Sequence, residues 1–182
     1  MFFQQKEHME SNKNLVLVGM MGSGKSTIGY LLSKKLNIKF VDIDRYIEKE
    51  VGLKITDIFH KKGENYFREI EEKISLQIMK INNQIIALGG GGFMNQKIRS
   101  GIMANHLSFW LNWSNFTLIK RLKTSKKRPL ILNLSEKEVK KIIYERSKIY
   151  SKANYKINCE KFSKNEIVKK IINIYNEHKI ID

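Results

Sequence analysis

Short apolar segments alternate along the chain with longer stretches in which apolar residues recur every three or four positions. Strands are predicted for the short segments, at residues 15–18, 38–41, 84–88, 107–111 and 155–158. Helices are predicted for the stretches with helical spacing, at residues 26–36, 45–51, 55–62, 65–81, 96–105, 115–123, 135–150 and 165–180. The clearest helix is residues 65–81, because its apolar side chains form one narrow stripe made of Phe67, Ile70, Ile74, Ile78 and Ile81.

This alternation predicts an α/β fold with a five-stranded parallel sheet and helices on both of its faces. Ligands of such folds bind at the carboxyl ends of the strands. The unusual residues of this chain follow strands: glycines come after the first and third, and Asp42 and Asp44 come after the second. The site is therefore expected at this edge of the sheet.

The composition narrows the class of protein. One cysteine, Cys159, among 182 residues excludes an intrachain disulfide and a zinc site of several cysteines. No apolar run approaches the roughly 20 residues of a membrane span, and the first 14 residues lack the apolar segment of a signal peptide. We expect a soluble, cytoplasmic monomer with an extension at residues 1–14 and a single domain at residues 15–182.

The charge is strongly basic, since 34 Lys and Arg against 18 Asp and Glu give a net charge of +16. Nucleic-acid or membrane binding would use such a charge, and so would attraction of a small anionic substrate. A third interpretation is compositional drift, because Lys, Asn and Ile are abundant throughout and the basic residues form no single long block. We expect no nucleic-acid or membrane partner, but the charge alone does not decide between these interpretations.

Residues 19–26, with the sequence GMMGSGKS, match the phosphate-binding P-loop between a predicted strand and a predicted helix. Its glycines allow the backbone N–H groups to point at phosphates, and the start of the helix adds positive potential. Lys25 would reach the β- and γ-phosphates, and the Ser26 hydroxyl would bind Mg²⁺. The switch and base-reading motifs of GTPases do not occur in the chain, so a kinase that acts on a small molecule is indicated.

Two acidic residues follow the second predicted strand. Side chains two positions apart in a strand project from one face, which would place Asp42 and Asp44 together at the site. One could hold Mg²⁺ through water while the other accepts a proton from a substrate hydroxyl. Alternatively, both only cap the helix that follows.

Other charged residues and glycines have two interpretations each. Arg68 and Glu71 are neighbours on a helix, either as a carboxylate-binding guanidinium with its partner or as a solvated pair. The glycines at residues 89–92 allow either close approach to a ligand or a flexible turn. Arg121, Arg128 and Arg146 are surface charges, unless an arginine on the basic loop closes over ATP.

The ordered set of these motifs resembles the shikimate kinase family over nearly the whole chain from Leu15. The family has a P-loop, Asp-x-Asp, Phe-Arg-x-x-Glu, Gly-Gly-Gly and Arg-Pro-Leu, which here begin at Gly19, Asp42, Phe67, Gly89 and Arg128. The resemblance implies a P-loop kinase fold with a mobile lid at about residues 121–134. It also implies Mg²⁺-assisted transfer of the γ-phosphoryl group of ATP to the 3-hydroxyl of shikimate, a step toward aromatic amino acids.

The resemblance further implies a role for each matched residue. It assigns ATP binding to Gly22, Ser23, Gly24, Lys25, Ser26, Thr27, Arg121 and Arg128. It assigns shikimate binding to Asp44, Arg68, Gly90, Gly91 and Arg146, with Glu71 steadying Arg68. It assigns catalysis to Asp44 as the base, to Lys25 and to the lid arginine Arg128. It assigns metal binding to Ser26 and Asp42.

The chain departs from the family pattern after Arg146, where Ser147 and Lys148 occupy a segment that usually contains proline. The loop after Ile157 is too divergent for its residues to be assigned. Gluconate kinases and nucleoside-monophosphate kinases share the P-loop and the fold, and a basic nucleic-acid-binding P-loop protein is an alternative of another class. If the chain were a nucleic-acid-binding P-loop protein, Asp44, Arg68 and Gly90 would not share a function.

Overall fold

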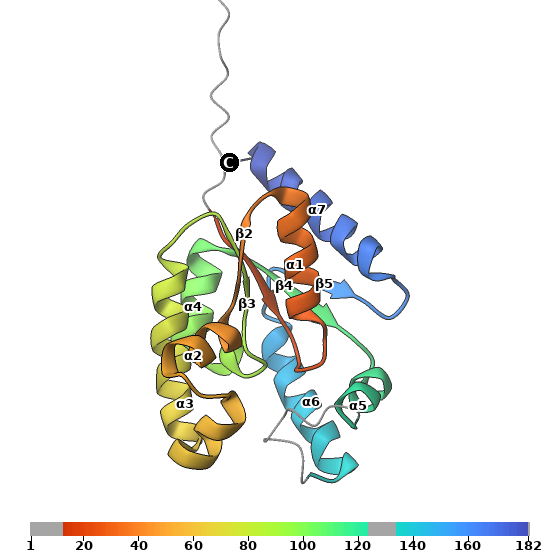
Figure 1. Ribbon diagram of the computed structural model, residues 1–182. Coiled ribbons are helices and arrows are strands. Elements are labelled where there is room, and N and C mark those ends of the chain that lie inside the picture. Colours follow the sequence, from red (N-terminus) through yellow and green to blue (C-terminus); the bar gives the residue numbers. More distant parts are fainter. Residues whose placement is uncertain (1–12, 124–133, 182) are drawn as a thin grey trace, which may run out of the picture.

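The computed structural model describes residues 13–123 and 134–181. Five parallel strands form one sheet in the order β2-β3-β1-β4-β5 (Figure 1). Their bounds are β1 Leu15–Val18, β2 Lys39–Asp42, β3 Gln84–Ala87, β4 Leu107–Asn112 and β5 Tyr155–Asn158. The predicted five-stranded parallel sheet is confirmed, with strand boundaries within one residue of those expected from the apolar segments.

The helices also follow the predicted pattern. Their bounds are α1 Lys25–Leu36, α2 Ile43–Val51, α3 Ile55–Met79, α4 Gln96–Asn105, α5 Asn115–Lys123, α6 Glu136–Tyr150 and α7 Lys164–Ile181, with a short 3₁₀ helix η1 at Gly92–Met94. The break predicted near Gly63 is a kink within α3, where Gly63 has φ 82° and ψ 170°. The apolar stripe is shorter than predicted, because Ile81 lies beyond the end of α3 and is exposed.

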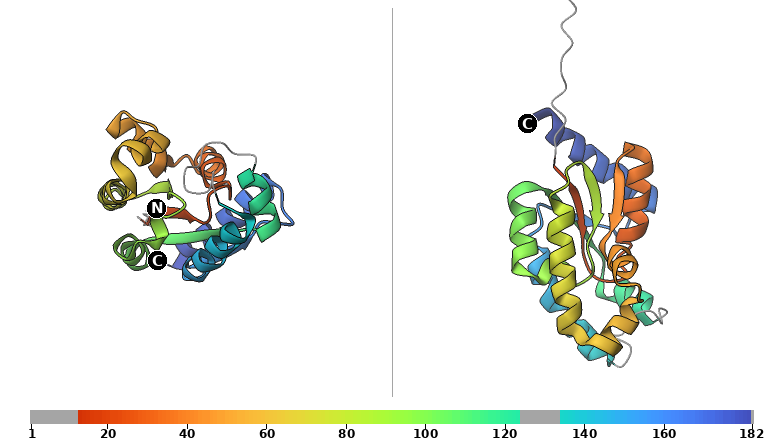
Figure 2. Two further views of the ribbon diagram at one scale, coloured as in Figure 1. Left: turned by 90° about the horizontal axis from the view of Figure 1, so that it is seen from below. Right: turned by 60° about the vertical axis from the view of Figure 1, so that its left-hand side comes forward.

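Helices cover both faces of the sheet, as predicted (Figures 1 and 2). On one face, side chains of α1 and α7 such as Leu32 and Ile171 pack against strand residues such as Leu17 and Phe109. On the other face, α2, α3, α4, α5 and α6 pack against strand residues such as Val16 and Ile86. Burial of these apolar side chains, worth about 1.5–3 kcal/mol for a fully buried Leu, Ile or Phe, fixes the sheet between two helical layers.

The carboxyl ends of the strands lie at one edge of the sheet. The P-loop follows β1, α2 begins at the end of β2, and the glycine run follows β3. The site is thus assembled at the edge predicted from the sequence.

Residues 1–12 and 124–133 lie outside the described residues, and so do most of the predicted extension and most of the predicted lid. Arg128 belongs to that part of the chain. Among the described helices, none combines the length and the apolar character needed to cross a membrane.

Candidate active site

The P-loop is a tight turn that glycines make possible. Gly22 has φ 81° and Gly24 has φ 91°, which is backbone of the left-handed kind that side chains with a Cβ rarely adopt. Gly24 then serves as the N-cap of α1, so the positive end of this helix meets the loop. The Lys25 ammonium, only 8% exposed, donates to the carbonyl oxygens of Gly19 at 2.8 Å and Met20 at 3.1 Å. Loop and ammonium together form a site for an anion.

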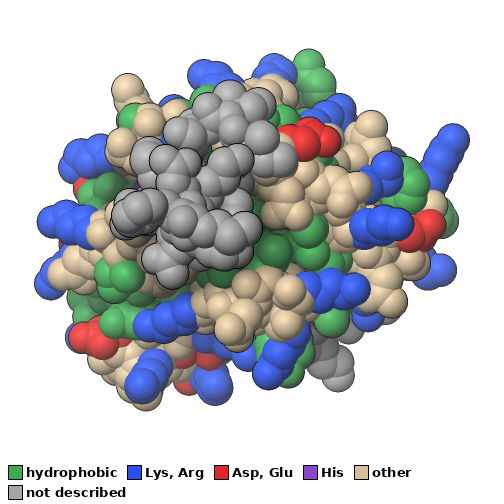
Figure 3. Space-filling view, turned by 90° about the horizontal axis from the view of Figure 1, so that it is seen from above, with side chains coloured by type: hydrophobic (Ala, Val, Ile, Leu, Met, Phe, Trp, Pro, Cys, Tyr) green, Lys and Arg blue, Asp and Glu red, His purple; other side chains and the backbone are tan. Residues whose placement is uncertain are grey.

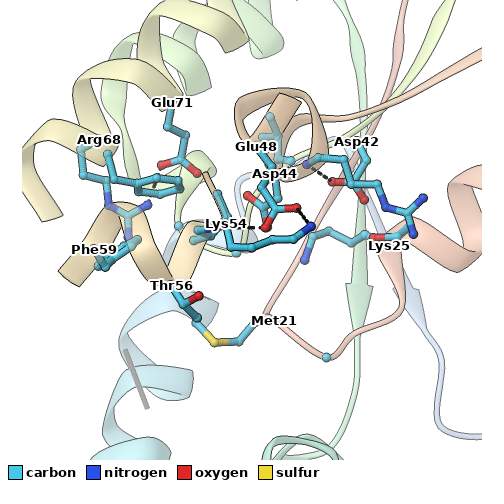
Figure 4. A pocket seen from close by; sticks show the side chains of 18 of the residues that line it. Met21, Lys25, Asp42, Asp44, Glu48, Lys54, Thr56, Phe59, Arg68 and Glu71 are labelled. Carbon is cyan, nitrogen blue, oxygen red and sulfur yellow. Dashed lines mark hydrogen bonds and ion pairs between the residues drawn. The ribbon is translucent and has the colours of Figure 1, made fainter. Parts of the chain in front are cut away.

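A cavity of about 670 Å³ extends from the P-loop to the middle of α3. Figure 4 shows that its side chains come from several elements, among them Lys25 from α1, Asp44 from α2 and Arg68 from α3. Basic, acidic and polar groups therefore line one continuous space that is large enough for two small ligands or parts of them.

Asp44 reaches this cavity from a helix and not from a strand, so the expectation from strand alternation was wrong. β2 ends at Asp42, which is the N-cap of α2 and accepts the backbone N–H of Arg45 at 3.3 Å. Asp44 lies in the first turn of α2. The capping alternative is correct for Asp42, yet both Asp42 and Asp44 line the cavity.

The residues predicted for a metal fit Mg²⁺. Ser26 and Asp42 both line the cavity, and their hydroxyl and carboxylate oxygens are the hard donors that this ion prefers. The described residues contain no group of three or more His, Cys, Asp or Glu side chains arranged around one metal position.

Arg68 is held by two carboxylates on its own helix. Its Nη1 donates to Oε2 of Glu71 at 2.5 Å, and its Nε and Nη2 donate to Oε1 of Glu64 at 3.2 and 3.0 Å. Burial alone would lower the pKa of Arg68, but Glu71 and Glu64 outweigh this and raise it. Burial raises the pKa of the Glu71 carboxyl, an effect that the charges of Arg68 and Arg146 oppose. The guanidinium is therefore permanently charged and fixed in orientation.

The backbone of the turn after β3 contacts both Arg68 and Arg146. The carbonyl oxygen of Gly90 accepts a hydrogen bond from Nη1 of Arg146 at 3.3 Å and another from the hydroxyl of Tyr150. Burial raises the pKa of Tyr150 to about 12, so its hydroxyl keeps the proton that it donates. A Cβ at Gly91 would lie 2.8 Å from Cζ of Arg68, which means that the guanidinium rests against this backbone. Close approach, rather than flexibility, is thus the reason for glycine here.

Two carboxylates of the site, those of Asp44 and Glu71, lie close to the backbone of Gly89. A Cβ at this position would lie 2.6 Å from Oδ1 of Asp44 and closer still to Oε1 of Glu71. Glu71 is 2% exposed, and Oε1 is a buried oxygen without a hydrogen-bond partner among the described residues. The absence of a side chain at Gly89 therefore lets Asp44 and Glu71 approach the same point.

Gly89→Ala is expected to keep the fold and to damage the site. The new methyl group would displace the ends of Asp44 and Glu71, and through Glu71 the guanidinium of Arg68. We therefore expect KM for the acidic substrate that the resemblance implies to rise about tenfold or more, and kcat to fall as well because Asp44 is displaced. Gly101→Ala is the control, because a Cβ there meets only Met79 at an ordinary 3.5 Å. Equal KM values for the two variants would contradict this account of Gly89.

The structure brings most of the predicted site residues together. Gly22, Gly24, Lys25, Ser26, Thr27, Asp42, Asp44, Arg68, Gly90 and Gly91 all line the cavity. Ser23 is buried behind them, and Arg146 contacts Gly90. Ser147 and Lys148 do not disturb this arrangement, because α6 continues through them to Tyr150.

Several functional candidates were not predicted from the sequence. Glu64 and Tyr150 each lie four positions from a predicted arginine, a spacing that places them on the same side of a helix. Trp113 directly follows β4 at the ligand-binding edge of the sheet and donates to the P-loop. Both patterns were visible in the sequence, but neither distinguishes a contact from an unrelated neighbour.

The strand order, the P-loop and the acid after the second strand define a P-loop kinase for a small molecule. A family model described as shikimate kinase matches residues 21–176. A shikimate kinase from Sulfurihydrogenibium is 44% identical over 160 residues, which cover 88% of this chain and 96% of the relative. One from Bacillus subtilis is 39% identical over 163 residues, covering 88% and 87%. The chain belongs to the shikimate kinase family.

Solved structures agree with this assignment. Shikimate kinase from Acinetobacter baumannii in complex with shikimate has a TM-score of 0.87 and 28% identity, and the match covers 93% of this chain and 96% of that one. A deoxyadenosine kinase from M. mycoides has a TM-score of 0.60 at 17% identity over 90% of this chain and 99% of that one. The latter similarity extends to the fold alone.

Proposed function

We propose that this protein transfers the γ-phosphoryl group of ATP to the 3-hydroxyl of shikimate, giving shikimate 3-phosphate and ADP. The observation that carries the proposal is that one continuous cavity has the P-loop at one end and Asp44 and Arg68 toward the other. A triphosphate and a small hydroxylated acid can lie side by side in such a space, which is the arrangement that phosphoryl transfer requires.

The P-loop end of the cavity suits the phosphates of ATP. The backbone of residues 22–27 would surround them, and Lys25 would turn its ammonium from the carbonyls of Gly19 and Met20 toward the β- and γ-phosphates. Ser26 and Asp42 would hold Mg²⁺, the latter through water. When bound, the ion neutralises charge on the transferring group. Arg121 and, from outside the described residues, Arg128 are proposed to contribute charge on the nucleotide side.

Asp44 is proposed as the base. It enters the cavity between the P-loop and the α3 residues, so its carboxylate could accept the proton of the attacking hydroxyl. The hydroxyl proton would go to Asp44 as the bond from oxygen to phosphorus forms and the bond to the leaving ADP oxygen breaks.

Arg68 and Arg146 are proposed to bind the carboxylate of shikimate. Glu71 links them, since it pairs with Arg68 directly and lies close enough to Arg146 for that charge to affect its pKa. The backbone at Gly90 and Gly91 forms the wall next to both guanidinium groups. Two fixed guanidinium groups favour a monoanionic acid over a neutral sugar.

The test is an ADP-release assay with shikimate, gluconate and nucleoside monophosphates as alternative acceptors. We expect turnover with shikimate and little with the others. Preferred turnover of gluconate or of a monophosphate would overturn the proposal. The basic charge does not bear on this choice, since the Lys and Arg side chains on the face in Figure 3 lie at separate points and form no continuous patch. A cytoplasmic monomer with one domain and a mobile lid stays a prediction.

Arg68→Ala is expected to raise KM for shikimate about a hundredfold while kcat falls much less, because a charge-assisted bidentate contact to the ground state is lost. Arg68→Lys should restore only part of the affinity, since an ammonium cannot bind a carboxylate bidentately. Lys73→Ala, at an exposed position of the same helix, is the control. An unchanged KM in Arg68→Ala would remove this residue from the binding site.

A further inference from the structure

Trp113 contacts the P-loop from the carboxyl end of the neighbouring strand β4. It directly follows β4, and its indole Nε1 donates to the carbonyl oxygen of Ser23 at 2.8 Å. β4 lies beside β1, the strand that leads into the P-loop. A half-buried aromatic side chain thus holds a backbone carbonyl of the phosphate-binding loop, although the two residues are far apart in the sequence.

Arg121 adds a second connection to the same loop. Its guanidinium carbon lies 3.7 Å from the centroid of the Trp113 ring, a stacked cation–π contact. Its Nη1 donates to the carbonyl oxygen of Gly22 at 3.2 Å. Trp113 and Arg121 therefore hold two successive carbonyls, those of Gly22 and Ser23, and they also hold each other.

The hydrogen bond to the Ser23 carbonyl determines where the next N–H group, that of Gly24, points. In a planar trans peptide, the C=O and the following N–H point in opposite directions. A hydrogen bond from Trp113 to the carbonyl of Ser23 therefore turns the N–H of Gly24 away from the indole. Gly24 lines the cavity, whereas Trp113 is not among its lining residues, so the tryptophan acts from behind the loop.

We propose that Trp113 is a positioning residue of the nucleotide site, which orients the Gly24 amide and the Arg121 guanidinium before the phosphates bind. The inference rests on the proposed function, because it assumes that the P-loop binds ATP and ADP. A pre-oriented amide increases affinity because the loop does not have to be ordered during binding. Loss of Trp113 should therefore weaken nucleotide binding and leave the shikimate side of the cavity intact.

Two substitutions separate the hydrogen bond from the ring contact. Trp113→Phe keeps an aromatic ring for Arg121 but removes the N–H, and we expect the Kd for ADP to rise about fivefold. Trp113→Leu removes both, and we expect a rise of about twentyfold. Calorimetry with ADP and Mg²⁺ measures both, and Phe116→Leu is the matched control because Phe116 lies on α5 and is 76% exposed.

Steady-state kinetics provides the readout that a merely structural role would not give. KM for ATP should rise with the Kd for ADP, while KM for shikimate stays within about twofold of the wild type. Arg121→Gln should weaken ADP binding in the wild type and have less effect in Trp113→Leu, since the two residues act as one unit.

The inference is overturned if Trp113→Phe binds ADP as the wild type does, or if KM for shikimate rises as much as KM for ATP. Should Trp113→Leu fail to fold, Trp113→Phe decides alone. Failure of the proposed function has a different signature: the wild type would bind ADP but not phosphorylate shikimate, and the comparison of ADP binding would still test Trp113.

Discussion

Lys25→Ala is expected to lower kcat about a thousandfold, because it removes the positive charge that we propose stabilises the transferring phosphoryl group. The ammonium is already buried at the P-loop on the carbonyl oxygens of Gly19 and Met20. As proposed above, it would turn from these carbonyls toward the phosphates of ATP. The charge on these phosphates shifts during transfer, so the loss should appear in kcat more than in the affinity for shikimate. Initial-rate kinetics with saturating shikimate measures it.

The control for Lys25 is Lys35→Ala, which removes an exposed lysine from the last turn of the same helix and should leave kcat unchanged. Lys25→Arg should remain strongly impaired, because the larger planar guanidinium cannot take the place of a compact ammonium in this loop. The unfolding temperature of each variant separates catalysis from folding. If Lys25→Ala retained more than about a tenth of kcat, the charge would have no special role in the transfer step.

The parts of the site that depend on local sequence were predictable. The P-loop combines glycines, which permit its left-handed backbone, with the start of a helix, and both lie within eight residues of sequence. The pairing of Arg68 with Glu71 follows from the geometry of one helix. The five strands and their order of appearance follow from short apolar segments. The signal is strongest for the central strands β3, β1 and β4, because a strand buried on both faces has few polar positions.

The parts that depend on how distant segments meet were not predictable in the same way. Arg146 and Arg68 belong to different helices and meet at the turn after β3, and only the fold shows that both approach Gly90 and Gly91. Trp113 and Ser23, which form a hydrogen bond, are also far apart in the sequence. The error about Asp44 has a local cause: the strand ends at Asp42 and the helix begins at Ile43, so the alternation rule was applied two residues too far.

Asp44→Asn is expected to lower kcat about a thousandfold, within the range of about 10²–10⁴ for loss of a general base. The amide has nearly the same shape as the carboxylate, so the cavity should keep its form. It cannot take up the proton of the attacking hydroxyl, however. ADP binding should be unchanged, because the phosphates are proposed to bind at the P-loop end of the cavity, away from Asp44. Calorimetry with ADP and single-turnover kinetics with shikimate measure the two properties separately.

Asp57→Asn is the matched control for this variant, since Asp57 is an exposed acid in the first turn of the next helix and does not line the cavity. The comparison corrects for the general stabilisation of a helix by an acid near its N-terminus, which contributes about 0.3–1 kcal/mol to the free energy of unfolding. Turnover of Asp44→Asn at the wild-type rate would exclude Asp44 as the base. Loss of ADP binding together with turnover would show instead that Asp44 organises the nucleotide end of the cavity. Selective loss of the chemical step is the result expected if the carboxylate beside Gly89 accepts the proton.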